Sequence, residues 1–279
     1  MLSTRILTAA VLIAAVLAAM FLLPPLAWGT LTLALVVVGA TEWADLAGFG
    51  KGAWWIFVVG TLIIGLNLLF SPFAGFTAGW PRGTVLAVCG VATVFWLLVA
   101  LPWLATRWKP TSSLPLAIAG WIVLIGAWVA IVELQARSPW LVLAAMAIVW
   151  IADTAAYFSG RAFGRRKLAP QVSPGKTWEG VYGGLAAVGL YALALVPLAA
   201  EGGFKGVVAP LSVIVWIALA LALAALSVVG DLCESLLKRQ AGVKDSGRLL
   251  PGHGGVLDRI DALLAAMPVA ALLAIAFLR

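Results

Sequence analysis

Residues 207–229 read VVAPLSVIVWIALALALAALSVV, a run without a single charged side chain. A helix needs about 20 mainly apolar residues to cross the hydrocarbon core of a bilayer, so this run predicts a membrane-spanning helix. Similar runs recur throughout the chain, whose 279 residues are 64% hydrophobic and 10% charged, with a mean hydropathy of +1.11. Soluble domains average about 45–50% apolar residues. The composition therefore excludes a soluble globular protein and predicts an all-α, polytopic integral membrane protein.

Nine apolar runs, bounded by charged residues, proline or glycine, are long enough to be transmembrane helices. The first follows Arg5 and lacks the A-x-A cleavage pattern of a signal peptide, so we expect a retained helix. No stretch is polar enough for a sizeable soluble domain. We expect a single membrane domain over residues 1–279, with scaffold spans in residues 1–140 and catalytic spans in residues 141–279. The nine runs lie near residues 6–23, 26–44, 53–70, 84–104, 114–134, 140–158, 180–199, 207–229 and 260–278.

Lysine and arginine are distributed unevenly between the two sets of loops that nine spans create. One set holds 14 of the 18 basic residues and the other holds 4. Because basic loops stay in the cytoplasm, we expect a cytoplasmic N-terminus and an external C-terminus in the inner membrane of the cell. The same rule accounts for the net charge of +7 without a nucleic-acid partner. Cytoplasmic loops 159–179 and 230–259 together hold ten of the fourteen basic residues.

Most of the eleven carboxylates lie between residues 153 and 261, around these two loops. Asp231 and Glu234 are three residues apart, as are Asp258 and Asp261, so on helices each pair shares a face. Asp258 and Asp261 also begin the last span, where the positive end of the helix dipole favours carboxylates. Mg²⁺ typically takes one or two carboxylates and fills its octahedron with water and substrate phosphate oxygens. We therefore expect a phosphate-directed magnesium site at the cytoplasmic face.

Each of these residues also has a purely structural interpretation. Asp258 or Asp261 alone is a suitable helix N-cap, and Glu234 with Lys238 is an ordinary i,i+4 ion pair. His253, the only histidine, is flanked by glycines and fits a tight turn. For any one of these residues, the structural interpretation is a strong alternative to a functional role. They do not explain why acids, bases, glycines and a histidine gather in about thirty residues of an otherwise apolar chain.

The loop at 159–179 contains Gly175-Lys176-Thr177, which invites comparison with a P-loop. The P-loop motif requires a glycine where this chain has Pro170, and we expect no strand before it. A Ser-Pro-Gly turn that presents Lys176 and hydroxyl groups to phosphate still fits the sequence. The basic run at 161–167 fits lipid head groups and substrate equally well. For Asp153, at the end of the sixth span, pairing with a loop arginine is the structural alternative.

The loop at 230–259 carries a long motif of fixed spacing. It reads Ser235-x-Leu237-Lys238-Arg239, four residues, then Lys244-Asp245-x-Gly247-x-x-Leu250-Pro251-x-His253-Gly254-Gly255-Val256-x-Asp258-Arg259-Ile260-Asp261. This pattern resembles the signature of the phosphatidate cytidylyltransferases, the CDP-diacylglycerol synthases of membranes. The nine-span layout is similar to that family, and so are Ser173-Pro174-x-Lys176-Thr177-x-Glu179-Gly180 and Asp153 with Tyr157 and Gly160.

The resemblance implies that CTP and phosphatidic acid react at the cytoplasmic face of a homodimeric membrane enzyme, giving CDP-diacylglycerol and pyrophosphate for phospholipid biosynthesis. It implies Mg²⁺ as cofactor, with a second cation beside it as a further option. Asp231, Asp258 and Asp261 would hold the metal and act in catalysis with Lys176, Lys238 and His253. Substrate-binding candidates are Ser173, Thr177, Glu179, Arg239, Lys244, Asp245, Gly254, Gly255, Arg259 and Asp153.

Two other functions compete with this interpretation. A CTP-dependent polyprenol or dolichol kinase shares the membrane setting and the nucleotide, but it transfers the γ-phosphate and releases CDP. A cation-coupled transporter would use Asp153 and Glu133 as ion sites within the membrane. We find no internal repeat of the kind that marks many transporters, and transport leaves the charged loops unexplained.

Overall fold

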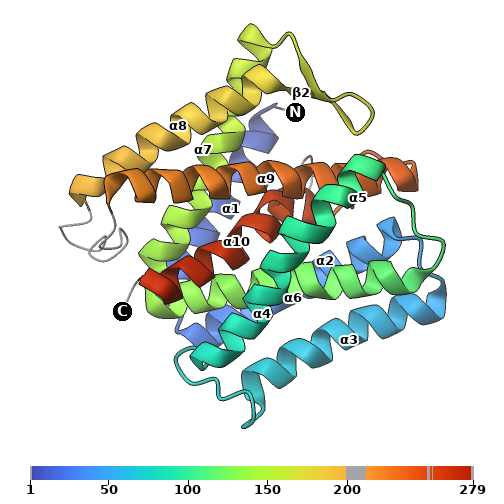
Figure 1. Cartoon of the computed structure of the whole chain (residues 1–279). Coiled ribbons are helices and arrows are strands. Elements are labelled where there is room, and N and C mark those ends of the chain that lie inside the picture. Colours follow the sequence, from blue (N-terminus) through green and yellow to red (C-terminus); the bar gives the residue numbers. More distant parts are fainter. Residues whose placement is uncertain (1, 199–211, 250–251, 253, 278–279) are drawn as a thin grey trace.

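The computed structural model describes residues 2–198, 212–249, 252 and 254–277 of the chain. Within this part, eight helices are long and apolar enough to cross a membrane, which confirms the predicted all-α, polytopic membrane fold (Figure 1). They are α2 (Pro25–Leu46), α3 (Lys51–Phe70), the continuous helix made of α4 (Arg82–Val94), η1 (Phe95–Val99) and α5 (Ala100–Thr106), α6 (Ser113–Arg137), α7 (Pro139–Phe163), α8 (Trp178–Leu198), α9 (Val213–Ala241) and α10 (Leu257–Phe277).

The first predicted run, residues 6–23, forms the helix α1 (Leu2–Leu22). Its described apolar segment Ile13–Leu22 is shorter than a membrane span, so α1 is not among the eight. Three predicted runs extend at one end beyond the described residues, namely 180–199, 207–229 and 260–278.

The eighth predicted span is longer than the hydropathy pattern indicates. The run was expected to end at residue 229, but α9 continues to Ala241 and carries the first part of the 230–259 loop as helix. Leu236 and Leu237 are buried in this extension, so packing sustains the helix after the charged residues begin. The helix ends where Gly242 adopts a left-handed conformation (φ 74°), which glycine tolerates without steric cost.

The 159–179 loop contains a β-hairpin that the sequence interpretation missed. Strand β1 (Lys167–Ala169) pairs antiparallel with β2 (Ser173–Thr177), with Lys167 opposite Thr177. The expectation that no strand accompanies Gly175-Lys176-Thr177 is therefore wrong. The P-loop interpretation still fails, because β2 runs directly into α8 without the glycine-rich loop that cradles phosphates. Figure 1 shows the hairpin extending from the adjoining ends of α7 and α8.

Close helix packing through glycines fixes the frame around the two loops. On α8, a Cβ at Gly180 or Gly184 would lie 2.8 Å from a backbone carbonyl oxygen of α7. Small residues let membrane helices approach in this way. The helix α10 packs against α4 and α6 as well as α9, and α2 reaches both α9 and α10. The scaffold helices of the first 140 residues therefore contact the helices that carry the charged loops.

Candidate functional site

A close crossing of α9 and α10 places Asp231 near Asp261. Gly230 has no room for a side chain, because a Cβ there would lie 2.6 Å from the Asp261 carbonyl oxygen and 3.0 Å from the Ala265 Cβ. Asp231 follows Gly230 directly, and its charge interacts with that of Asp261. Two of the three carboxylates expected to bind metal are therefore brought together by backbone packing.

The β-hairpin delivers Lys176 to these carboxylates. The Lys176 ammonium group forms an ion pair with Asp231, whose other oxygen accepts a hydrogen bond of 3.3 Å from Ser235 Oγ. The Lys176 and Asp231 side chains are 25% and 26% exposed, so solutes can reach this pair. Asp153, on α7, interacts electrostatically with both of them. Residues from α7, β2, α9 and α10 thus meet at one half-buried polar site.

Lys238 occupies a more enclosed position, about two helical turns beyond Asp231 along α9. Its ammonium group pairs with Glu234 on the same helix and lies 2.7 Å from Asp258 Oδ1 on α10. The side chains of Lys238, Glu234 and Asp258 are 12%, 4% and 6% exposed. Since charges are costly to bury without partners, this three-residue cluster depends on its mutual pairing.

Asp258 also organises the segment that precedes α10. Its Oδ2 atom accepts hydrogen bonds from Ser246 N (2.8 Å), Ser246 Oγ (3.0 Å) and Gly255 N (2.8 Å). Gly254 has φ +81°, and a Cβ there would lie 2.5 Å from Asp258 Oδ2. The glycines of the motif therefore let the backbone wrap closely around this carboxylate, while the other Asp258 oxygen contacts Lys238.

Glu42 is a residue at this site that the sequence interpretation did not include. It lies on α2, is 5% exposed, and accepts hydrogen bonds from Ser246 Oγ (2.9 Å), Val256 N (2.9 Å) and Leu257 N (2.8 Å). A carboxylate in an apolar span is costly and calls for a partner, which is the one sequence signal available. Its partners are more than 200 positions away, so spacing does not reveal them.

Two residues expected to bind substrate, Thr177 and Glu179, accept hydrogen bonds from the backbone of the hairpin and its neighbours. Thr177 Oγ1 accepts a hydrogen bond of 3.1 Å from Gly180 N, as an N-cap of α8 does. Glu179 accepts hydrogen bonds from Arg165 N (3.0 Å) and Arg166 N (3.1 Å). These contacts fix the turn between α7 and β1.

The other described candidates are Arg239, Ser173, Lys244, Asp245 and Arg259. Arg239 Nε donates a hydrogen bond of 3.2 Å to the Val172 carbonyl oxygen and thereby ties the hairpin to the end of α9. Ser173 is half-buried in β2, Lys244, Asp245 and Arg259 are exposed, and His253 lies outside the described residues.

The donor set suits a cation, although the described side chains do not form a finished metal site. In the described part of the chain, no three His, Cys, Asp or Glu side chains converge at metal-ligand distances. Buried Glu234 is paired with Lys238 through Oε2, its Oε1 has no hydrogen-bond partner among the described residues, and its charge adds to those of Asp231 and Asp261. With Asp153 and Asp258, five carboxylates stand against the ammonium groups of Lys176 and Lys238. This excess of negative charge fits a divalent cation.

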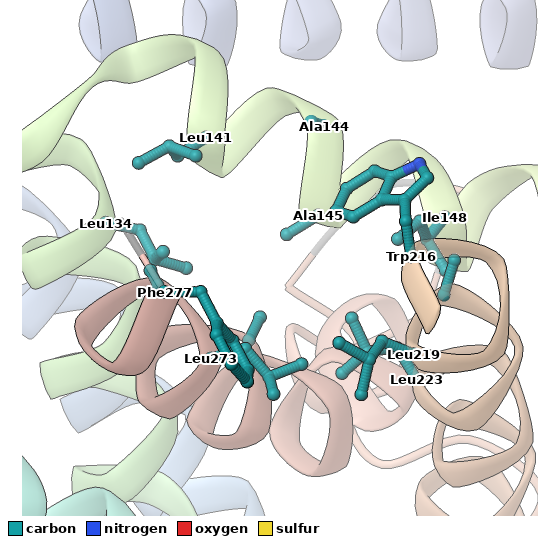
Figure 2. Close-up of a pocket in the computed structure, with 13 residues that line it drawn as sticks. Leu134, Leu141, Ala144, Ala145, Ile148, Trp216, Leu219, Leu223, Leu273 and Phe277 are labelled. Carbon is teal, nitrogen blue, oxygen red and sulfur yellow. The ribbon is translucent and has the colours of Figure 1, made fainter. Parts of the chain in front are cut away.

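An apolar pocket lies apart from the charged cluster, between α6, α7, α9 and α10 (Figure 2). Leu141 and Ile148 face Leu219 and Leu273 across it. Leu219 is twelve residues from Asp231 along α9, which corresponds to about 18 Å of helix. Trp216 brings an indole N–H to the wall, but this group donates to the Ala192 carbonyl oxygen. The pocket therefore suits hydrocarbon, and the phosphate-directed groups lie elsewhere.

Comparison with known proteins agrees with this geometry. The model of the cytidylyltransferase family matches residues 3–277. The chain is 42% identical to a phosphatidate cytidylyltransferase of Pseudomonas aeruginosa, over 98% of this chain and 97% of that protein. It is 40% identical to the protein of that name from Haemophilus influenzae (96% of each chain) and 36% identical to that of Brucella suis (95% and 90%). With matches of this extent, the chain belongs to the cytidylyltransferase family and is a membrane-embedded nucleotidyltransferase.

Proposed function

We propose that the protein transfers the cytidylyl group of CTP to phosphatidic acid, forming CDP-diacylglycerol and pyrophosphate. The observation that carries the proposal is the half-buried group of Asp231, Asp261 and Lys176 beside the enclosed Lys238. Lysines among carboxylates, at the end of membrane helices, suit two phosphate-bearing substrates of which one is a lipid. The relatives named phosphatidate cytidylyltransferase support the same reaction.

In the proposed reaction, a phosphate oxygen of phosphatidic acid attacks the α-phosphorus of CTP. The bond from that phosphorus to the oxygen bridging the α- and β-phosphates breaks, and its electron pair leaves with pyrophosphate. Phosphoryl-group transfer of this kind depends on positioning and charge neutralisation and needs no protein nucleophile. Lys176, on the half-exposed side, is placed to neutralise charge on a phosphate group that enters the site.

We propose Mg²⁺ as the cofactor, held by Asp231 and Asp261. Bound Mg²⁺ supplies Lewis-acid chemistry and offsets the negative charge of the phosphates. The family resemblance also implies Asp258 as a metal ligand. Both Asp258 oxygens already accept hydrogen bonds, one from Lys238 and the other from Ser246 and Gly255. These contacts favour a role for Asp258 in placing Lys238. A second cation beside Mg²⁺ and a catalytic role for His253 remain predictions from the family resemblance.

We further propose that the enzyme lies in the inner membrane with its charged site on the cytoplasmic face, its N-terminus inside and its C-terminus outside. The supporting observation is the concentration of lysine and arginine in the loops that contain this site. That face gives access to CTP from the cytoplasm and to phosphatidic acid from the adjoining leaflet. The family resemblance also supports a homodimer as the functional unit.

The test is pyrophosphate release by the detergent-purified full chain supplied with CTP, phosphatidic acid and Mg²⁺. We expect release that requires all three, with samples lacking lipid and samples with ATP in place of CTP as controls. If CTP and a polyprenol instead gave CDP, the protein would be a lipid kinase. If folded protein released neither product, the proposed reaction would be wrong.

A further inference from the structure

Glu42 connects a scaffold helix to the segment that begins α10. Both Glu42 oxygens are used, since Oε1 accepts from Val256 N and Oε2 accepts from Leu257 N and Ser246 Oγ, at 2.8–2.9 Å. The two backbone N–H groups belong to the first turn of α10 and the residue before it, where a helix lacks internal acceptors. A side chain from α2 therefore caps a helix that starts more than 200 residues later in the sequence.

A hydrogen-bonded path leads from Glu42 to Lys238. Ser246 Oγ lies 2.9 Å from Glu42 Oε2 and 3.0 Å from Asp258 Oδ2, so its single hydroxyl proton is shared between the two carboxylates. The opposite oxygen of Asp258 lies 2.7 Å from Lys238 Nζ. The position of the Lys238 ammonium group thus depends on Asp258, and the position of Asp258 depends on a segment that Glu42 holds.

The packing around Glu42 leaves little freedom for alternatives. A Cβ at Gly247 or Gly255 would lie 2.5 Å from Glu42 Oε1, so side chains at these positions would displace the carboxylate. One turn earlier on α2, a Cβ at Gly39 would lie 3.3 Å from the Leu257 side chain. The α10 start is therefore seated directly on α2.

We propose that Glu42 is a positioning residue of the cytidylyl-transfer site, which acts by holding Ser246 and the start of α10 on α2 and, through Ser246 and Asp258, by placing Lys238. This inference rests on the proposed function for its effect on turnover. A carboxylate is required because it accepts hydrogen bonds at both oxygens, whereas the amide of glutamine would turn an N–H₂ group toward donors. The negative charge of Glu42 also interacts favourably with the positive end of the α10 helix dipole.

The test is a double-mutant cycle between Glu42→Gln and Ser246→Ala in the full-length enzyme. We expect Glu42→Gln to lower kcat/KM by about 10²-fold, as a displaced reacting group does, and Ser246→Ala to lower it by about tenfold. Because both act through one path, adding Ser246→Ala to Glu42→Gln should cost less than about twofold more. Losses that multiply in full would overturn the path from Glu42 to Lys238.

Glu133→Gln is the matched control. Glu133 is another buried carboxylate in a span, 3% exposed, which accepts from Trp80 N at 3.2 Å and from Arg137 Nε at 2.9 Å. It contacts none of the residues of the charged site in the described part of the chain. We expect Glu133→Gln to lower the thermal stability while leaving kcat/KM per folded molecule unchanged. An equal loss of kcat/KM in both variants would reduce Glu42 to a general structural role.

Hydrogen exchange separates failure of this inference from failure of the proposed reaction. We expect the backbone amides of residues 246–249 and 254–257 to exchange at least tenfold faster in Glu42→Gln than in wild type or Glu133→Gln. Unchanged exchange there would overturn the inference even in an active enzyme. If exchange is faster in Glu42→Gln but the wild-type protein releases no pyrophosphate, the role of Glu42 in holding the start of α10 is supported and the proposed reaction is overturned. If Glu42→Gln does not fold, Ser246→Ala is the test. We expect faster exchange and a lower kcat/KM in that variant, and wild-type values of both would overturn the inference.

Discussion

Lys176 and Lys238 both pair with carboxylates of α9, but their surroundings differ. The Lys176–Asp231 pair is about one-quarter exposed and joins a hairpin to a helix, whereas Lys238 is enclosed between Glu234 and Asp258 with all three side chains at most 12% exposed. An exposed pair contributes little to stability and can exchange its partner for a substrate. A buried cluster stabilises the fold only while it stays complete. We therefore propose that Lys176 exchanges its carboxylate partner for substrate, whereas Lys238 is held in a fixed position by its two buried partners.

Asp231→Asn should give the largest effect on turnover. The substitution removes the charge that pairs with Lys176 and that we assign to the metal, so we expect pyrophosphate release to fall about 10³-fold or more. Thermal unfolding should change little because the pair is partly exposed. Asp45→Asn is the control, since Asp45 is exposed and contacts Trp54 Nε1. Near-normal turnover in folded Asp231→Asn would contradict the metal assignment.

Lys176→Met should lower activity without lowering stability. We expect a loss of about 10²-fold in kcat/KM, because a positioned cation that stabilises transition-state charge has been removed. The melting temperature should stay within a few degrees of wild type. A large fall in melting temperature with normal kcat/KM would reverse the roles drawn from the comparison.

Lys238→Met, unlike Lys176→Met, should lower the thermal stability of the protein. The substitution leaves Glu234 and Asp258 buried without their cation, and breaking a buried pair typically costs about 3–5 kcal/mol. We expect a clear drop in the melting temperature measured in detergent, together with a loss of kcat/KM at least as large as that of Glu42→Gln, which acts through Lys238. Adding Glu234→Gln, which removes one of the two stranded charges, should restore part of it. No drop in Lys238→Met would show that the cluster is not maintained by pairing.

Glu179→Gln should give a smaller and local effect. Glu179 accepts hydrogen bonds from the backbone N–H groups of Arg165 and Arg166, and losing them should loosen the turn between α7 and β1. We expect faster tryptic cleavage at the exposed basic residues 165–167, with global melting little changed. Cleavage at the wild-type rate, together with a raised KM for CTP, would favour the substrate-binding role expected from the sequence.

Asp45→Asn should have the smallest effect. Asp45 lies three residues beyond Glu42 on α2, but it is exposed and forms a hydrogen bond of 2.9 Å with Trp54 Nε1. Substitutions at such exposed positions usually change stability by less than about 0.5 kcal/mol. We expect wild-type pyrophosphate release and melting. A large loss in Asp45→Asn would mean that the whole end of α2, and not Glu42 specifically, supports the site.

The membrane fold and the location of the charged site could be predicted from the sequence, because long apolar runs and the 230–261 motif are local signals. The last three turns of α9 could not, since hydropathy falls at Asp231 while buried Leu236 and Leu237 keep the helix packed. The hairpin was missed because strands of three and five residues carry no clear alternation. Glu42 was missed because its partners lie on a segment more than 200 residues away, which only the folded chain brings near.

The roles of individual motif residues also could not be predicted from the sequence. A resemblance places Thr177, Glu179 and Asp258 in one site but does not say which atoms each one meets. The structure shows Thr177 and Glu179 bound to backbone N–H groups, and Asp258 shared between Lys238 and the segment before α10. A residue that keeps a loop in place and a residue that touches substrate can have the same chemistry and spacing, so spacing alone does not separate the two.

The central claim, that the cluster at the α9–α10 crossing transfers a cytidylyl group to a lipid, is tested most directly by following the phosphorus atoms of CTP. The full-length enzyme is incubated with phosphatidic acid and Mg²⁺ and with CTP labelled at either the α- or the γ-phosphate. We expect α-label in the extracted lipid and γ-label in pyrophosphate, with both transfers lost in Asp231→Asn. Label from the γ-phosphate in the lipid would contradict the account and identify a kinase.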